Sequence, residues 1–262
     1  MEYLLVSVTA LFVAGLTFFS GFGLGTLLMP VFAVFFPVKI AIAATAMVHL
    51  ANNIFKVLLV GRHAKLKIVL LFALPGAIAA VCGALLLNYV ASFSVLAEYD
   101  LFGGTIYITP VKIVIAGLII TIAGVELSPY FRHIAFDAKF IPLGGILSGF
   151  LGGLSGHQGA LRTAFLVRAG LDKRSLIGTM VVAAVVVDLS RLVIYGLTFL
   201  HHDFSVLREQ GVIGLIMIGS FSAFAGSFAG SRLLGKMTIT GLRRFIAMML
   251  IMLALAMGIG II

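Results

Sequence analysis

Long apolar stretches, separated by short polar loops, make up almost the whole chain. A β-barrel would instead show short segments of alternating polarity. Runs of about eighteen or more apolar residues are long enough to cross the hydrocarbon layer as helices. The pattern therefore predicts an all-α, polytopic membrane protein embedded in a lipid bilayer. The apolar segments lie at residues 2–36, 38–61, 68–90, 108–125, 140–167, 175–199, 211–231 and 245–262.

Composition supports this class and excludes others. Of the 262 residues, 62% are hydrophobic and only 10% are charged, whereas a soluble domain needs far more polar surface. The net charge of +9 would fit a nucleic-acid partner, but the basic residues lie mostly in short loops, so we expect none. The single cysteine, Cys82, lies inside an apolar segment. Neither a disulfide framework, a metal site nor a cofactor is expected.

The basic residues are concentrated in four of the loops. Loops 62–67, 132–139, 168–174 and 232–244 hold twelve Lys and Arg residues, whereas the remaining loops hold three. Basic loops stay on the cytoplasmic side of an inner membrane, so these four are predicted to lie inside. Both termini are then predicted on the non-cytoplasmic side.

One apolar segment has predicted cytoplasmic loops at both of its ends. Segment 140–167 must therefore enter and leave on the same face, and its Gly-rich, polar middle, 152–159, would break a helix. Segment 2–36 has the same build, with a Gly-rich break at 20–25. Both are predicted to be re-entrant hairpins, because broken backbone at this depth needs protein or a water-filled cavity around it.

The two halves of the chain resemble each other weakly. Each half, 1–130 and 131–262, contains one broken segment and three further spans. Three is odd, so the second repeat would be inverted within a single membrane domain, as in many secondary transporters. The alternative topology treats the broken segments as kinked spans, giving eight crossings and parallel repeats. An offset of 134 residues aligns Gly15 with Gly149, Gly25 with Gly159, and Thr45 with Thr179.

Four charged residues fall within the apolar segments. Each costs about 2.5–3.5 kcal/mol to insert, so Lys56, Arg162, Asp188 and Arg191 are functional candidates. Lys56 could instead extend to the cytoplasmic interface. Asp188 and Arg191 are spaced i, i+3 and form either a coupling site or a structural ion pair. Asp188 and the intramembrane histidines make protons a candidate coupling ion.

Polar residues form a stripe on one helical face of segment 38–61. Positions 45, 49, 52 and 56 are spaced four, three and four residues apart, so they face the protein interior. Interhelical hydrogen bonding by Asn52 and Asn53 is the structural alternative.

In each hairpin the second helix should begin at the break, near Thr26 and near Ala160. Helix N-termini present free N–H groups and partial positive charge, so two converging ends predict an anion site. Arg162 would lie in the first turn of the second helix, where a cation is unfavourable unless an anion binds. Alternatively, the glycines permit close packing and Arg162 reaches a carbonyl. The predicted substrate-binding residues are Gly23, Gly25, Thr26, Thr45, His49, Asn52, Asn53, Ser155, His157, Gln158, Arg162 and Thr179.

These residues resemble those of a known family, the sulfite exporter TauE/SafE family, also called the sulfonate uptake permease family. The resemblance covers the whole chain in length and layout. It implies ATP-independent transport of sulfite, thiosulfate-like anions or small organosulfonates. The motifs that carry it are Gly21-Phe22-Gly23-Leu24-Gly25-Thr26-Leu27-Leu28-Met29-Pro30, Ala43-Ala44-Thr45, Asn52-Asn53, Gly149-Phe150-Leu151-Gly152-Gly153 and Gly178-Thr179.

The sequence thus predicts a secondary transporter that exports a small inorganic or organosulfur anion, and not an enzyme. An anion-selective channel and a homo-oligomeric assembly remain open. An intramembrane serine protease is the enzyme alternative, because residues 153–156 resemble a Gly-x-Ser-Gly motif. That chemistry needs a histidine base beside Ser155, usually from another helix, and His201 and His202 lie in a predicted loop.

Overall fold

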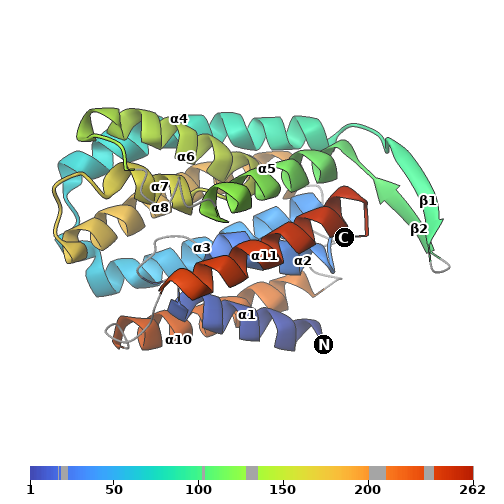
Figure 1. Cartoon of the computed structure of the whole chain (residues 1–262), viewed down its shortest axis with the longest axis horizontal. Coiled ribbons are helices and arrows are strands. Elements are labelled where there is room, and N and C mark those ends of the chain that lie inside the picture. The colour runs from blue at the N-terminus through green and yellow to red at the C-terminus, as the bar shows by residue number, and fades with distance from the viewer. Residues whose placement is uncertain are drawn as a thin grey trace.

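The structure is a computed structural model that describes residues 1–16, 18, 23–101, 104–127, 135–200, 211–232 and 239–261, with the backbone alone for Glu126 and residues 239–246. The helices lie side by side as an elongated bundle, and one β-hairpin projects beyond its end (Figure 1). The elements are α1 (Glu2–Leu16), α2 (Leu24–Ala33), α3 (Val38–Val60), α4 (Leu66–Ala91), β1 (Ala97–Leu101), β2 (Gly104–Ile108), α5 (Pro110–Leu127), α6 (Ile141–Ser155), α7 (Gly159–Leu166), α8 (Lys173–Tyr195), α10 (Val212–Arg232) and α11 (Ile239–Gly258). A short 3-10 turn at Gly61–His63 extends α3, and another at Ala138–Phe140 precedes α6. A π-helical turn at Gly196–Leu200 extends α8.

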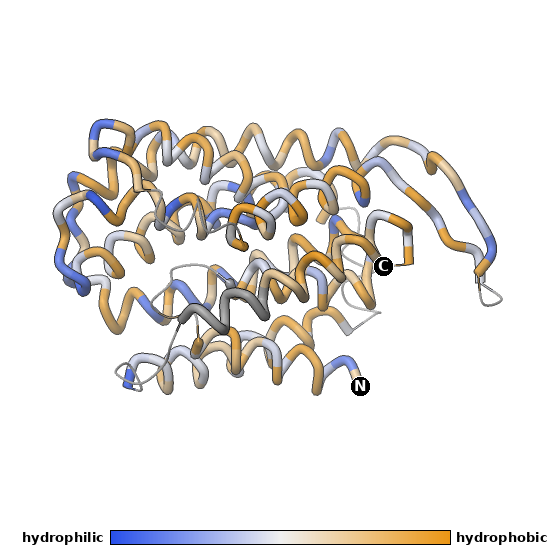
Figure 2. Tube along the Cα trace, in the orientation of Figure 1, coloured by the Kyte–Doolittle hydropathy of each residue, from blue (hydrophilic) through white to orange (hydrophobic). Residues whose placement is uncertain are grey.

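The outside of the bundle is suited to lipid. Hydrophobic residues cover the lengths of the helices, and hydrophilic residues gather at the ends of the bundle and in parts of its interior (Figure 2). Leu58, Ile78 and Leu197 are 79%, 70% and 75% exposed, a surface that water would penalise. The predicted all-α polytopic class is confirmed. Within the described residues, five helices are long and apolar enough to cross a membrane, namely Val38–His63, Leu66–Ala91, Ala138–Ser155, Lys173–Leu200 and Val212–Arg232.

Helices from the two halves of the chain interlock. α6 packs along α4 and α1 along α10, so each half inserts a helix beside a long helix of the other half. In the centre α3 crosses α8, and α5 packs against α11. Most of the buried apolar side chains in the first core cluster come from α1, α2 and α3 of the first half and α10 and α11 of the second.

Helices α6 and α7 form a hairpin that opens at one end of the bundle. The ring of Phe136, before α6, stacks on Phe165 at the end of α7 with a centroid distance of 4.1 Å. The backbone N–H of Phe136 also donates to the Ala164 carbonyl at 3.2 Å. The chain therefore enters and leaves this segment at the same end, as the loop charges predict. At 8 residues, α7 is about 12 Å long, far short of a bilayer span.

The first predicted break covers residues 20–25, and its residues 20–22 lie outside the described part of the chain. Gly23, which precedes α2, has φ 123°, a conformation that strains residues with a Cβ. α2 has 10 residues and packs against α1 and α3. It is therefore also too short to cross the bilayer, at about 15 Å.

The sequence did not predict the β-hairpin. Strands β1 and β2 pair antiparallel, from Ala97 opposite Ile108 to Leu101 opposite Gly104. The Tyr99 hydroxyl donates to the Ile259 carbonyl at 2.6 Å, which ties the hairpin to the C-terminal residues. The hairpin and both termini lie at the same end of the bundle (Figure 1). The turn after α3 and the start of α8, which carry basic residues, lie at the opposite end.

Glycines bring α4 and α6 into backbone contact. Gly145, Gly149 and Gly153 recur every four residues and so share one face of α6. A Cβ at any of them would overlap a backbone carbonyl oxygen of α4, those of Phe72, Gly76 and Ala80 respectively. Small residues allow this approach between membrane helices, where packing rather than water exclusion drives association.

Replacing Gly149 with leucine should therefore force α4 and α6 apart. We expect a loss of about 3 kcal/mol or more in unfolding free energy, because overpacking a tight interface is costly. Thermal unfolding in detergent measures this loss. Gly117 is the matched control, since it is exposed on α5 and nothing lies within 4 Å of its Cβ position. Equal stability of the Gly149→Leu and Gly117→Leu variants would contradict the close contact.

Candidate functional site

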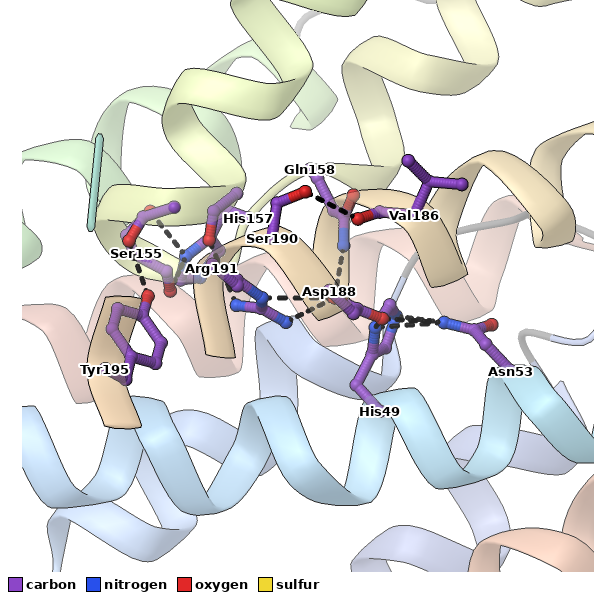
Figure 3. A network of polar contacts seen from close by, with 12 residues as sticks. His49, Asn53, Ser155, His157, Gln158, Val186, Asp188, Ser190, Arg191 and Tyr195 are labelled. Carbon is purple, nitrogen blue, oxygen red and sulfur yellow. Dashed lines mark hydrogen bonds and ion pairs between the residues drawn. The ribbon is translucent and has the colours of Figure 1, made fainter. Parts of the chain in front are cut away.

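Asp188 lies at the centre of a polar network inside the bundle and is 0% exposed (Figure 3). Its Oδ1 accepts from Arg191 Nη2 at 2.7 Å and Nε at 3.1 Å, and from Gln158 Nε2 at 2.8 Å. Its Oδ2 lies 2.7 Å from His49 Nδ1 and accepts from Asn53 Nδ2 at 3.2 Å. The carboxylate is therefore fully engaged, and one residue connects α3, α8 and the α6–α7 break.

Simple helical spacing places these side chains. His49 and Asn53 are one turn apart on α3, and Asp188 and Arg191 share a face of α8, so both pairs point to the crossing of the two helices. Gln158 enters from the break, where it is the N-cap residue of α7.

The α6–α7 break is stabilised by the same network. Gly156 ends α6 with φ 84°, the left-handed conformation common after helices. The last carbonyls of α6 then need partners inside the protein. Arg191 Nη1 donates to the Gly152 carbonyl at 3.0 Å, and the Tyr195 hydroxyl donates to the Gly153 carbonyl (Figure 3).

The two predicted breaks meet. A Cβ at Gly25, in the first turn of α2, would lie 3.3 Å from the carbonyl oxygen of Gly156. It would also lie 3.7 Å from His49 Cδ2 and 4.0 Å from Thr45 Cγ2. The start of α2 therefore lies against the end of α6, beside the polar stripe of α3.

Buried positive charge exceeds buried negative charge. Lys56, Arg162 and Arg191 are 6%, 3% and 0% exposed, whereas Asp188 is the one buried carboxylate among the described side chains. Lys56 does not extend to the interface, because its ammonium lies 5.3 Å from the centroid of the buried Phe18 ring. Arg162 Nη1 donates to Gln158 Oε1 at 3.3 Å. With Lys56 counted as charged and His49 as neutral, the buried side chains among the described residues carry two positive charges in excess.

Among the described residues, several buried polar side chains have an atom without a hydrogen-bond partner. These atoms are Thr45 Oγ1, Asn52 Nδ2 and His157 Nε2. An unpaired buried donor or acceptor costs about 1–3 kcal/mol, so each is a candidate for contacting a ligand. The other end of the Asn52 amide is occupied, since its Oδ1 accepts from Ser227 Oγ at 2.7 Å. The unpaired nitrogen remains a donor.

Comparison with known proteins identifies the family. The family model for sulfite exporter TauE/SafE matches residues 3–257. The chain belongs to the sulfite exporter TauE/SafE family. No curated protein and no solved structure gives a match. Membership confirms the resemblance and supports a membrane transporter of the sulfite or sulfonate type.

The sequence-predicted residues of this TauE/SafE protein do not all lie together. Gly25, Thr45, His49, Asn53 and Gln158 meet in or beside the Asp188 network, and Arg162 adjoins it. Thr179 lies near the other end of α8, where its hydroxyl accepts from the Lys65 backbone N–H at 3.0 Å. Nine residues of helix separate Thr179 from Asp188, about 14 Å. Gly23 and Thr26 lie at the start of α2.

Ser155 and His157 form a local pair at the break. His157 Nδ1 lies 3.1 Å from Ser155 Oγ and 3.0 Å from the Ser155 carbonyl oxygen. The Ser155 hydroxyl donates to the Leu151 carbonyl at 3.0 Å, and both side chains are buried. Within the described residues, no group of three or more His, Cys, Asp or Glu side chains is arranged to hold a metal ion.

Sequence reasoning missed Tyr195 and Ser227. Tyr195 could have been found from its spacing, because it follows Arg191 by one helical turn and therefore shares the face of α8 that carries the charges. Ser227 lies on α10, and only the packing of α10 against α3 brings it to Asn52.

The ion pair of Asp188 and Arg191 should be strongly coupled. Replacing Arg191 alone with methionine leaves a buried carboxylate short of its main partner, and we expect a loss of about 3–5 kcal/mol in stability. A double variant, Asp188→Leu with Arg191→Met, removes both charges and should lose much less than the sum of the two single losses. Unfolding of the purified variants measures the coupling. Additive losses would show that the two side chains act independently.

Proposed function

We propose that the protein is a secondary transporter that exports a small anion, sulfite or an organosulfonate, across the inner membrane. The observation that carries this proposal is the excess of buried positive charge beside the meeting point of the two breaks. Charge buried at membrane depth is unfavourable unless it is compensated. An anionic substrate provides that compensation, and a metal cation would add to the repulsion.

The N-terminal ends of α2 and α7 also favour a negatively charged substrate. α2 and α7 begin at the breaks, so their N-terminal N–H groups and partial positive charges lie inside the protein. Arg162 lies in the first turn of α7, where it opposes the helix dipole. An anion at this point interacts favourably with both. The unpaired donor of Asn52 adds a neutral hydrogen bond.

The transport mechanism we propose is alternating access between two inverted repeats, 1–130 and 131–262. Helices in corresponding places agree in length, since α1 and α6 have 15 residues each and α3 and α8 have 23 each. In the two proposed repeats α1 corresponds to α6 and α4 to α10, and the packing of α6 on α4 corresponds to the packing of α1 on α10. Transporters of this build bind substrate at the repeat interface. A coupled proton would act through His49 and Asp188, which bridge the halves.

Proteoliposomes containing the purified protein should take up radiolabelled sulfite faster than empty liposomes. The flux should saturate and show counterflow, which distinguishes a carrier from a channel. Arg162→Ala should abolish anion binding, because it removes a buried positive charge. Arg174→Ala is the matched control, since Arg174 is exposed in the basic region at the start of α8. Uptake no faster than in empty liposomes, for sulfite and for short sulfonates, would refute the proposed function.

The positive charge of the loops predicts that the β-hairpin and both termini lie outside the cytoplasm. A cysteine at the exposed Thr105, in a Cys82→Ala background, should react with a membrane-impermeant maleimide in intact cells. A cysteine at the exposed Lys67, at the basic end, should react only after the cells are permeabilised. The reverse pattern would invert the proposed orientation.

A further inference from the structure

The central helices of the two halves carry charged residues in matching positions. α3 begins at Val38 and α8 at Lys173, and both have 23 residues. Asn53 and Lys56 are the sixteenth and nineteenth residues of α3. Asp188 and Arg191 are the sixteenth and nineteenth residues of α8. The starts of α2 and α7, at residues 24 and 159, differ by the same 135 residues, one more than the offset that aligns the glycines.

The matching residues Asn53 and Asp188 touch each other. Asn53 Nδ2 donates to Asp188 Oδ2 at 3.2 Å. In two repeats related by a two-fold axis, equivalent positions contact each other only where the axis passes. The two cations, three residues further along each helix, then lie on opposite sides of this point.

The two cations differ in their partners. Arg191 is neutralised by Asp188 at 2.7 Å and also donates to the Gly152 carbonyl. Lys56 is preceded at the equivalent position by Asn53, an amide that cannot neutralise it. Among the ion pairs of the described residues, none involves Lys56. Its ammonium lies over the Phe18 ring, a weaker contact than a carboxylate would provide.

An unpaired donor lies beside Lys56. Asn52 precedes Lys56 by four residues, so the two side chains are neighbours on one face of α3. Asn52 is 1% exposed, and its Nδ2 has no partner while its Oδ1 is held by Ser227. A buried ammonium and a buried amide N–H on one helical face together fit an oxyanion.

We infer that Lys56 and Asn52 contact the negative charge of the substrate, and that Arg191 is a structural cation which holds the α6–α7 break. The inference rests on the proposed function, because it requires an anionic substrate. The two equivalent positions are asymmetric, since Arg191 is already neutralised by Asp188, whereas Lys56 is left for the substrate to neutralise. A small oxyanion, with charge on oxygens that accept from both groups, is the class of ligand that fits.

Lys56→Gln tests the inference in proteoliposomes, with initial rates of sulfite or short alkanesulfonate uptake measured over a range of concentrations. Loss of a charge-assisted contact should raise KM about tenfold or more. Lys56→Arg keeps the charge and should retain uptake. Lys67→Gln makes the same change at an exposed position and should behave as the wild type.

Asn52→Asp provides a second test, which keeps Lys56 in place. It puts a carboxylate one helical turn before Lys56, where one oxygen can still accept from Ser227 and the other replaces the unpaired amide nitrogen, so Lys56 becomes neutralised without substrate. We expect a larger rise in KM than for Asn52→Ala, which removes the same amide but adds no charge. Ligand-dependent thermal stabilisation of each purified variant checks that it is folded and reports binding apart from turnover.

The outcomes separate the two proposals. If the wild type transports the anion and Lys56→Gln keeps the wild-type KM, the role of Lys56 is refuted and the proposed function stands. If Asn52→Asp binds the anion no more weakly than Asn52→Ala, the asymmetric site is refuted as well. A wild type that moves none of these anions refutes the proposed function and this inference together.

Discussion

A carboxylate at the depth of a membrane keeps its charge only if partners replace the water that it has lost, and Asp188 meets this condition. Both of its oxygens are engaged, and their partners come from α3, from α8 and from the break between α6 and α7. Removing a solvated ion from water costs several kcal/mol, so the geometry around it must be well defined. This requirement fixes how α3 crosses α8 and where the hairpin ends.

The broken segment depends on the same interaction. Helix α6 stops inside the bundle, and its last carbonyls would be unpaired in lipid. Arg191 and Tyr195 satisfy two of them, and Asp188 holds the Arg191 guanidinium in place. The glycines of α6 contribute by letting α4 lie against it, so that protein rather than lipid surrounds the break. A polar network and a close-packed apolar contact thus stabilise one hairpin from two faces.

Much of this arrangement follows from the sequence because two strong signals reinforce each other. The length of the apolar segments predicts the helices. The positive charge of both loops that flank segment 140–167 predicts a hairpin there, and in the structure the stacked rings of Phe136 and Phe165 close it. Spacing on one helix correctly groups Asp188 with Arg191. The predicted stripe of 45, 49, 52 and 56 omits Asn53, which is the residue that bonds to His49 and Asp188. Thr179 shows the limit, since its alignment with Thr45 cannot reveal that its hydroxyl bonds to Lys65 near the end of the bundle. Contacts between distant segments, such as Ser227 with Asn52, depend on packing that no local pattern encodes.

The β-hairpin was missed for a related reason. Residues 97–108 connect two long helices, and a short strand pair has a much weaker signal than an apolar helix of eighteen residues or more. Its position is set by contacts made far along the chain, because Tyr99 bonds to Ile259 and Lys112 to Gly260. These bonds tie the connection between α4 and α5 to the end of α11. The hairpin therefore links the last helix of one half to the last helix of the other, at the end of the bundle opposite the basic turns. That link restrains one end of the bundle, whereas the Asp188 network holds the central crossing of α3 and α8.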